Sequence, residues 1–402
     1  MAIIEKKNNI ISQQVIKENN LKTLFSLIYD YGEMSRARLA EITELSPTTI
    51  SSLVEELIQG GLVNTKGVSD SNSIGRKPIM LEINKDALYF AAFNWGTKKL
   101  RFYLFDLMCN VVDEEVIGID NPSDGVGVIY ETINEHVHKK IDHKKLYAIC
   151  LSIPAIIEES TKTIGSTVLG LKEDREFLVN LSKAFDRIPV IIGNESIFSA
   201  YAEKEFGKEK KAKDLVYLNI NEGVGAGIVL DGRLFKGSRG MAGEFGHISI
   251  DLNGKACMCG NQGCLERYIS VPAILEAYRD KNGSAPVDSI DELRALIEAR
   301  DENAVSVIGE TAKYLAYGLV DVINLLNINH IVIGGAITGL GPVFMDAIHR
   351  HTDSLGIRRM IEECEIKYSQ LTGPVSCMGA VKCCIDNIMC LSIDVEKKVH
   401  IY

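Results

Sequence analysis

The stretch HISIDLNGKACMCGNQGCLE, residues 247–266, gathers one imidazole and three thiols within twenty residues. His247, Cys257, Cys259 and Cys264 form a donor set that suits tetrahedral zinc, and glycines between the cysteines let the backbone turn sharply. Because the protein fills all four positions, the ion would be structural. The sequence therefore predicts a zinc loop over residues 247–264. The alternative is three buried cysteines that lie close together by chance.

Two carboxylates flank this loop. Glu244 lies just before the predicted ligands and Glu266 just after them. A loop held by a metal ion would fix both side chains in place. A rigid pair of carboxylates suits the binding of a polyol.

Length and composition describe an ordinary globular protein. The 402 residues predict two or three domains, and 46% hydrophobic with 24% charged residues is typical of a folded chain. The chain has no apolar run long enough for a signal peptide or a membrane span, so we expect no membrane association and a cytoplasmic location. Residues 1–86 carry ten Lys and Arg against eleven Asp and Glu, while the whole chain has a net charge of -10. Only this N-terminal part could approach DNA without strong repulsion.

The N-terminal sequence predicts a helix-turn-helix. Apolar residues from Leu21 to Tyr31 recur at helical spacing up to Gly32, and Ser35 is a candidate N-cap for a second helix. Ser46 followed by Pro47 predicts the start of a third helix. Its leading face is polar and uncharged and could reach phosphates and base edges. The candidate DNA contacts in these helices are Arg36, Arg38, Ser46, Thr48, Thr49, Ser51 and Ser52.

A two-stranded wing is predicted to follow. Residues 62–64 and the alternating residues 79–83 would pair, with the basic tip GRKP at 75–78 between them. Arg76 and Lys77 are candidate DNA contacts, and Arg76 could enter a minor groove. The alternatives are a small protein-binding bundle for the helices and a solvated loop for the tip.

The remainder of the chain repeats one pattern. A strand, a glycine-containing turn and a second strand occur over residues 90–107 and again over residues 215–230. Helices and strands alternate after each hairpin. This duplication predicts an α/β protein with two similar lobes and a cleft between them.

Residues from about 86 to 390 resemble the ROK family of sugar kinases and sugar-responsive repressors. The motifs that carry the resemblance are EFGH at 244–247 and CMCGNQGCLE at 257–266. The resemblance implies an actin-like fold for residues 86–402, and a winged helix over residues 1–85 is typical of the repressor branch. It also implies a structural Zn²⁺, and a homodimer or a dimer of dimers. The sugar-binding residues implied are Asn194, Glu195, Glu244, His247 and Glu266.

The chain departs from the kinase pattern at three places, of which the two phosphate turns favour a repressor and the first, where glutamate could still accept a proton, does not decide. The kinases have Asn-Asp, with the Asp as base, where this chain has Asn194 and Glu195; the added methylene displaces the carboxylate by on the order of 1 Å, which can cost about a hundredfold in rate. Their first phosphate turn, Asp-x-Gly-Gly-Thr, is replaced by NWGTK at 94–98. Their second, Gly-Thr-Gly, is replaced by Asn221, Glu222 and Gly223, which sets a carboxylate beside the polyphosphate.

These departures predict a cleft that binds sugar without binding nucleotide productively. We therefore predict no catalytic residue and interpret the chain as a DNA-binding transcriptional repressor of carbohydrate-utilisation genes, with a sugar as effector and operator DNA as partner. The replacement of Asp by Glu195 resembles repressors of the xylose-responsive kind. The alternative is an ATP-dependent sugar kinase that carries a regulatory DNA-binding domain.

Overall fold

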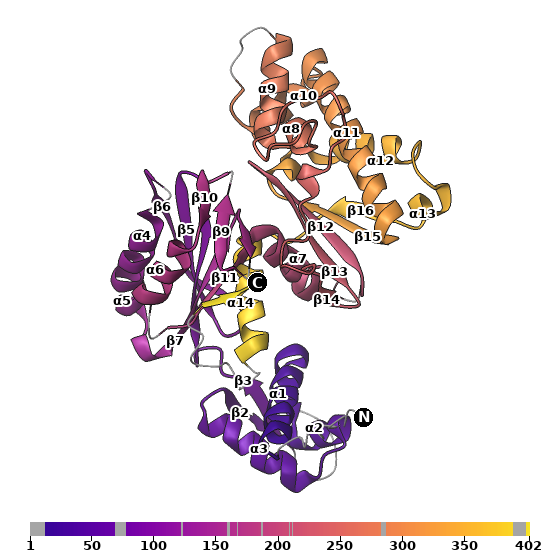
Figure 1. The fold of residues 1–402 in the computed structure, drawn as a ribbon. Helices are drawn as coiled ribbons and strands as arrows, with labels where there is room; N and C mark the ends of the chain where they lie inside the picture. Colours follow the sequence, from indigo (N-terminus) through magenta and orange to yellow (C-terminus); the bar gives the residue numbers. More distant parts are fainter. Residues whose placement is uncertain are drawn as a thin grey trace, which may run out of the picture.

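The computed structural model describes residues 13–68, 78–121, 124–158, 161–166, 168–185, 188–208, 210, 212–282, 287–388 and 399–402. It contains an N-terminal domain and two α/β lobes (Figure 1). The chain enters lobe 1 from the N-terminal domain, builds lobe 2, and returns to lobe 1 through its last helix and strand. The α/β class and the two-lobed body predicted from the sequence are confirmed.

The N-terminal domain has three helices and a small antiparallel sheet. Its elements are α1 (Gln13–Tyr31), β1 (Met34–Ser35), α2 (Arg36–Thr43), α3 (Pro47–Gln59), β2 (Val63–Val68) and β3 (Ile79–Ile83), with strand order β1-β3-β2. Both predicted caps are confirmed, since Ser35 Oγ accepts from the Arg38 amide at 3.2 Å and Ser46 Oγ from the Thr49 amide at 3.1 Å. The antiparallel pairing of β2 with β3 has the form of the predicted wing.

Lobe 1 is built on a six-stranded sheet of order β17-β11-β7-β4-β5-β6. Its elements before the crossing into lobe 2 are β4 (Tyr89–Trp95), β5 (Lys99–Asp106), β6 (Val111–Gly118), α4 (Gly125–Thr132), a π-helical turn (Ile133–Val137), α5 (His138–Lys140), a 3₁₀ turn (His143–Lys145), β7 (Leu146–Ile153), β8 (Ile156–Glu158), β9 (Thr163–Ser166), β10 (Leu171–Asp174), α6 (Glu176–Ala184) and β11 (Val190–Asn194). The returning elements are α14 (Val375–Ile388) and β17 (Val399–Ile401). Strands β8 to β10 form a separate antiparallel sheet beside the cleft.

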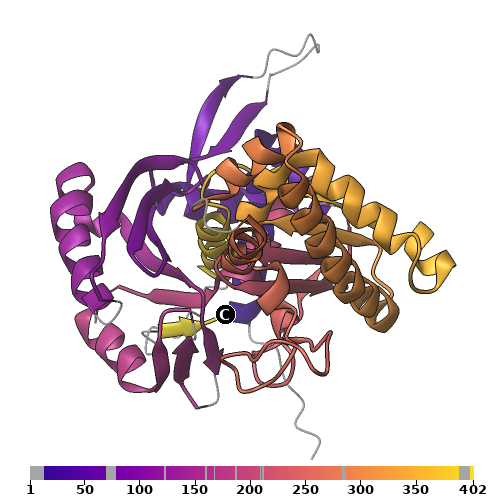
Figure 2. The same cartoon turned by 90° about the horizontal axis from the view of Figure 1, so that it is seen from above.

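Lobe 2 is built on a five-stranded sheet of order β14-β13-β12-β15-β16, reached through the helix α7. The helix α7 (Glu195–Phe206) lies between the two lobes. The elements of lobe 2 are β12 (Leu215–Ile220), β13 (Val224–Leu230), β14 (Arg233–Leu234), a 3₁₀ turn (Phe245–His247), α8 (Glu266–Ile269), α9 (Val271–Asn282), α10 (Ile290–Glu298), α11 (Glu302–Leu326), β15 (His330–Gly334), a second 3₁₀ turn (Ala336–Leu340), α12 (Gly341–Thr352), α13 (Arg358–Glu362) and β16 (Glu365–Tyr368). The hairpins β4-β5 and β12-β13 are the predicted duplication, and each is antiparallel. The cartoon seen from above shows the lobe 2 helices on the outer side of its sheet (Figure 2).

The N-terminal domain packs firmly against lobe 1. Apolar residues of α1 belong to one continuous core with residues of α14 and the lobe 1 sheet. The shared cluster includes Leu24, Phe25 and Ile28 of α1 and Val381 and Cys384 of α14. The adjacent cysteines 383 and 384 are buried and free, as predicted for core thiols. Motion in lobe 1 can therefore reach the N-terminal domain through packed side chains.

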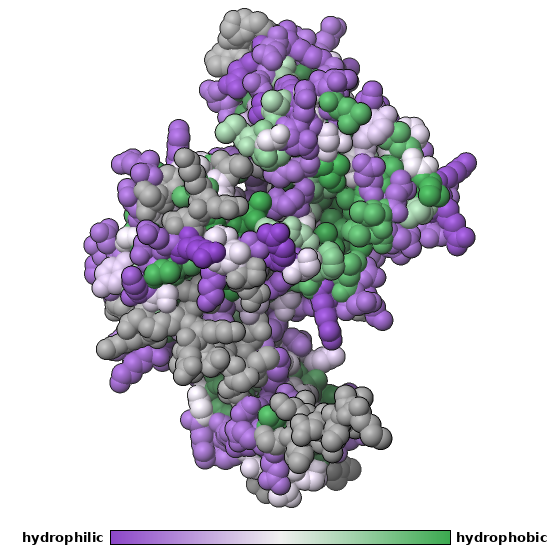
Figure 3. All heavy atoms as spheres, viewed as in Figure 1, coloured by the Kyte–Doolittle hydropathy of each residue, from purple (hydrophilic) through white to green (hydrophobic). Residues whose placement is uncertain are grey.

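The described surface is mostly hydrophilic. On the face in Figure 3 the largest hydrophobic area lies over lobe 2. The exposed apolar side chains of the lobe 2 helices and their connections include Val305, Tyr317, Leu325, Val343 and Ile357. Among the described residues, no helix combines the length and apolar character required to cross a bilayer.

Candidate functional site

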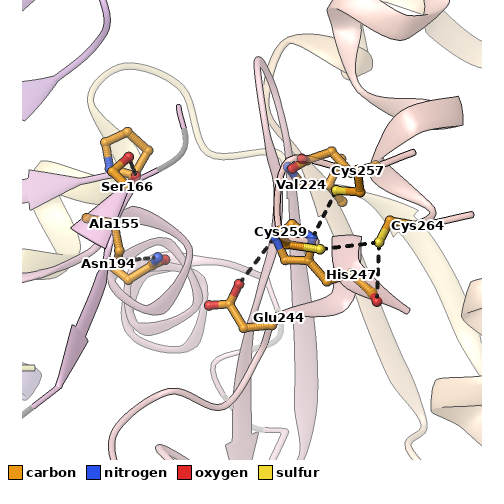
Figure 4. Close-up of polar contacts among 11 residues, drawn as sticks. Ala155, Ser166, Asn194, Val224, Glu244, His247, Cys257, Cys259 and Cys264 are labelled. Atoms are coloured by element: carbon orange, nitrogen blue, oxygen red, sulfur yellow. Dashed lines mark hydrogen bonds and ion pairs between the residues drawn. The ribbon is translucent and has the colours of Figure 1, made fainter. Parts of the chain in front are cut away.

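The predicted metal ligands come together in lobe 2. One donor atom from each of His247, Cys257, Cys259 and Cys264 lies within 4.8 Å of the other three. Cys257 Sγ is 3.7 Å from His247 Nδ1, and Cys259 Sγ is 3.6 Å from Cys264 Sγ (Figure 4). Two short bridges, Ser249 to Cys264 and Ala256 to Gln262, fold the irregular loop back on itself.

This donor set fits a tetrahedral ion. Ligands at about 2.0–2.3 Å from a central zinc lie roughly 3.5–3.8 Å apart in a regular tetrahedron, which matches the two distances above. Gly263 has a positive φ of 69°, and a Cβ there would lie 1.7 Å from the Asp251 carbonyl oxygen, so the turn requires glycine. Since Nδ1 of His247 faces the thiols, its Nε2 points away, toward Glu244 Oε2 at 3.8 Å. A carboxylate behind a ligating histidine is the usual outer-shell partner.

A cleft of about 740 Å³ lies between the two lobes next to this loop. All five predicted sugar-binding residues line it, and they are Asn194, Glu195, Glu244, His247 and Glu266. In Figure 4, Glu244 lies between the His and Cys group and Asn194. The cleft is large enough for a monosaccharide and offers carboxylates from both lobes.

Two of these residues also hold the walls of the cleft. Asn194 caps α7, since its Oδ1 accepts from the Ser196 amide at 2.8 Å and its Nδ2 donates to the Ala155 carbonyl at 3.0 Å. Glu266 Oε2 accepts from the Val224 amide at 2.9 Å, which ties α8 to the start of β13. Glu266 keeps its Oε1 atom for a ligand, and Asn194 keeps the second hydrogen of its Nδ2 group.

Glu195 lies at the bottom of the cleft as the first residue of α7. Burial raises its pKa to about 7, and Glu222 adds to the rise while a bond from Asn94 and the charge of Arg101 oppose it. The Asn94 Nδ2 atom lies 3.5 Å from Glu195 Oε2 and 3.3 Å from Ser376 Oγ. Burial also raises the pKa of Glu244, which His247 lowers and Glu266 raises further.

The other half of the interlobe region is smaller and is bridged by side chains. A cavity of about 350 Å³ lies behind Glu195, lined among others by Asn94, Arg101, Asn219 and Gly335. At the two turns that replace the phosphate turns, Thr97 Oγ1 lies 3.1 and 3.3 Å from the two carboxylate oxygens of Glu222. The β4-β5 hairpin of lobe 1 is thus bonded directly to the β12-β13 hairpin of lobe 2.

The sequence did not reveal the outer rim of the cleft. Arg239 Nε of lobe 2 donates to Glu158 Oε1 of lobe 1 at 2.8 Å, and both residues line the cleft. Tyr402 also lines it, because β17 pairs with β11 and the Tyr402 amide donates to the Ile192 carbonyl at 2.8 Å. No local motif marks these residues, since only the tertiary fold brings them to the cleft.

The candidate DNA contacts lie on the outer face of the N-terminal domain where they are described. Arg38, Ser46, Thr48, Ser51 and Ser52 are exposed. Thr49 and Arg36 are half-buried: the Thr49 hydroxyl is 2.8 Å from Ser46 Oγ, and Arg36 is 3.9 Å from Glu55. Arg76 and Lys77, the predicted wing tip, lie outside the described residues.

The ROK family profile matches residues 90–386. The chain belongs to the ROK family. Within it, the chain is 28% identical to a xylose repressor of Caldicellulosiruptor bescii over 93% of this chain and 97% of that protein. It is 27% identical to the Bacillus subtilis xylose repressor over 95% of this chain and 98% of that protein. The Escherichia coli regulator NagC is 27% identical over 83% of this chain and 84% of its own length.

Solved ROK structures share the fold. A ROK family transcriptional regulator, described as a homologue of the E. coli MLC protein, superposes with a TM-score of 0.81 at 28% identity, covering 95% of this chain and 99% of that one. A ROK glucokinase from Streptomyces griseus, solved with glucose and AMPPNP, gives a TM-score of 0.64 at 20% identity over 73% of this chain and 98% of its own. The kinase match stops short of the full chain, whereas the regulator match extends over nearly all of it.

Proposed function

We propose that this ROK protein is a sugar-responsive, DNA-binding transcriptional repressor of carbohydrate-utilisation genes. The observation that carries the proposal is that the two halves of the interlobe region differ in whether their polar groups are available to a ligand. We call the cleft lined by Glu244 and Glu266 the sugar half, and the region of the Thr97 and Glu222 turns the nucleotide half. The sugar half is a cleft in which the bond across the lobes, from Arg239 to Glu158, joins only two of its lining residues and leaves Glu244 and Glu266 unbridged. In the nucleotide half the two turns that replace the phosphate turns are themselves bonded to each other by Thr97 and Glu222. The named repressors among its relatives, matched over more than nine-tenths of the chain, support the same function.

Residues 1–85 are the proposed DNA-binding domain, and residues 86–402 the proposed effector-binding body. The helix α3 would enter the major groove with its polar leading end, and the wing would contact the adjacent backbone. Thr48, Ser51 and Ser52 are exposed there and can reach base edges or phosphates. Arg38 and Ser46 would contact the backbone, as would Arg36 and Thr49 after small rearrangements.

The bound metal is proposed to be a structural Zn²⁺, held by His247, Cys257, Cys259 and Cys264. A bound ion would fix the loop and, through His247, the position of Glu244. Glu244, His247 and Glu266 would then bind one side of the sugar, and Asn194 with Glu195 the other hydroxyls. D-xylose is the first candidate effector, because the relatives matched over most of their length include xylose repressors.

The effector acts by population shift. A sugar that bridges the two lobes prefers the closed cleft, so it raises the population of that state. In a homodimer, or in a dimer of dimers, a change in lobe closure alters the spacing of the two recognition helices relative to the operator half-sites. The exposed apolar side chains of lobe 2 provide a surface that a second copy could cover.

The experiment uses the purified full-length chain and a duplex from the DNA upstream of its own gene. We expect a gel shift by the protein, released by D-xylose or another monosaccharide from a panel, and a rise in melting temperature with the same sugar. Thr48→Ala should weaken the DNA complex without changing sugar binding. Absence of a specific DNA complex would refute the proposal, as would a complex that ignores every sugar of the panel.

A sugar kinase is the second candidate, favoured by Glu195. A buried carboxylate with a pKa of about 7 at the bottom of a sugar cleft has the property of a general base. We nevertheless expect no sugar-dependent ADP formation from ATP, because the turns that would hold the phosphates are bonded to each other. Turnover at ordinary enzyme rates that is lost in Glu195→Gln would establish the kinase.

A further inference from the structure

Lys382, on α14, is a buried lysine that lines neither the sugar cleft nor the smaller cavity behind Glu195. Its exposure is 5%, and its Nζ atom lies 2.5 Å from Asp386 Oδ1 and 3.6 Å from Glu205 Oε2. An ammonium group removed from water is tolerated only where carboxylates compensate it. The position of Lys382 is therefore set by these partners.

The partners of Lys382 belong to three different elements. Asp386 lies one turn further along α14 and also accepts a bond from the Tyr201 hydroxyl of α7 at 2.5 Å. Glu205 is a residue of α7, one turn beyond Tyr201 on the same face. From the N-terminal domain, the ring of Tyr29 on α1 lies with its centroid 4.9 Å from the lysine nitrogen. Tyr29 is held in turn by a bond to Cys109 Sγ at 3.6 Å.

The helix α7 connects this cluster to the sugar cleft. It begins at the cleft, with Asn194 as its cap and Glu195 as its first residue, and its last turn carries Glu205. Twelve residues span about 18 Å, so one rigid element reaches from the effector site to the partners of Lys382. Figure 1 shows α7 between the lobes and α14 extending from them toward α1.

The packing around α7 leaves it no room to move alone. A Cβ on Gly227 of β13 would lie 2.3 Å from the Ser196 carbonyl oxygen, and one on Gly379 of α14 would lie 1.8 Å from that of Phe198. Lobe 2 therefore touches the backbone of α7 on one side and α14 touches it on another. A displacement of α7 on lobe closure must therefore also displace α14.

We propose that Lys382 is a positioning residue that couples the effector cleft to the DNA-binding domain. This inference rests on the proposed repressor function. When the sugar closes the cleft, lobe 2 displaces α7, and Tyr201 and Glu205 of α7 draw Asp386 and Lys382 of α14 with them. Lys382 follows its carboxylates, and the Tyr29 ring on α1 follows Lys382. Lys382 thus adds a polar connection between α7, α14 and α1 to the apolar core that the N-terminal domain shares with lobe 1.

The test measures the coupling itself. The affinity for the upstream duplex is measured with and without saturating D-xylose, and the ratio of the two dissociation constants is the coupling factor. Such factors are typically about 5–150 in allosteric proteins. In Lys382→Met we expect the ratio to fall at least about fivefold toward 1, while the xylose affinity of the free protein stays within about twofold, because Lys382 does not line the cleft.

Two further variants keep the test decisive. Tyr29→Leu removes the contact from the α1 side without leaving a buried charge, and it should lower the ratio in the same way if Lys382→Met does not fold. Lys281→Met is the matched control, since Lys281 pairs with Glu310 at 2.7 Å within lobe 2. Its ratio should equal that of the unmodified protein.

The outcomes separate the two proposals. If the unmodified protein shows no sugar-dependent change in DNA affinity, the repressor function fails, whatever the variants do. If it responds, and Lys382→Met or Tyr29→Leu folds and keeps the full ratio, only the coupling role of Lys382 is overturned. A purely structural role would lower the melting temperature and leave the ratio unchanged.

Discussion

The two halves of the interlobe region share a fold but differ in how their polar groups are used. In the sugar half, Glu244 and Glu266 face an open cleft of about 740 Å³. In the nucleotide half, Thr97 and Glu222 are bonded to each other across the lobes. The nucleotide half is the more polar of the two, so polarity alone does not make a binding site. A group that is directed at solvent can receive a ligand, and one that is satisfied by the opposite lobe cannot.

The Thr97 to Glu222 bond joins the two turns between which a nucleotide would lie in a kinase. In a kinase the phosphates would lie between the two hairpin turns. Here the Thr97 hydroxyl and the Glu222 carboxylate connect the same turns within the chain. With the turns bonded in this way, the proposed regulator needs no nucleotide to join them.

The largest expected effect is removal of the metal from the sugar half. We expect Cys259→Ser to lose the metal ion and to weaken sugar binding about 10–100-fold, because Glu244 would no longer be held through His247. Mass spectrometry under native conditions measures the metal content of the variant, and titration with the sugar measures its affinity. Cys364→Ser is the control, since this half-buried cysteine of lobe 2 lies outside the ligand group. Retained zinc with unchanged sugar affinity would contradict the proposed loop.

The next effect tests the sugar half without disturbing the metal. Glu244→Ala should leave DNA binding intact and weaken sugar binding by about 1.5 kcal/mol, roughly tenfold, since a charged hydrogen-bond partner of the sugar is lost. Calorimetry and gel shift measure the two affinities. Glu298→Gln, on the exposed end of α10, should change neither. If Glu244→Ala lost DNA binding as well, the substitution would have damaged the fold.

Local patterns predicted the ligand loop because its four donors lie within eighteen residues and its glycines need positive φ. The caps Ser35 and Ser46 were predicted for the same reason, since each acts within three residues. The sequence could not reveal the Thr97 to Glu222 bond or the Glu158 to Arg239 pair, whose members lie 125 and 81 residues apart. It also did not predict that the last strand returns to lobe 1. Such contacts depend on tertiary packing and leave no local periodicity.

A pH experiment examines Glu195, which lies between the two halves. Its pKa is raised from 4.5 to about 7 by burial, so between these values the folded protein holds a proton that the unfolded chain has released. The free energy of unfolding should therefore fall as the pH rises through this window, by on the order of 1–3 kcal/mol. Glu195→Gln should remove this dependence: it should be more stable than the unmodified protein at pH 8 and about equal to it at pH 4.5. Urea unfolding at both pH values measures the difference. Equal pH dependence in the two proteins would show that Glu195 titrates normally.

The smallest effect concerns the bridge in the nucleotide half. Thr97→Val keeps the shape of the side chain and removes the hydroxyl donor, and Glu222→Gln removes the charge. The pair of Thr97 and Glu222 is exposed. Each change should therefore make the free energy of lobe closure less favourable by only about 0.2–1 kcal/mol. Because the sugar prefers the closed cleft, each variant should bind it about 1.5–5-fold more weakly. A double-mutant cycle on sugar affinity isolates the bond, and the double variant should be no weaker than the weaker single variant. Fully additive losses would mean that the two side chains act separately and do not close the lobes together. In that case the sugar half would close without help from the nucleotide half, and the contrast between them would carry no consequence for the response.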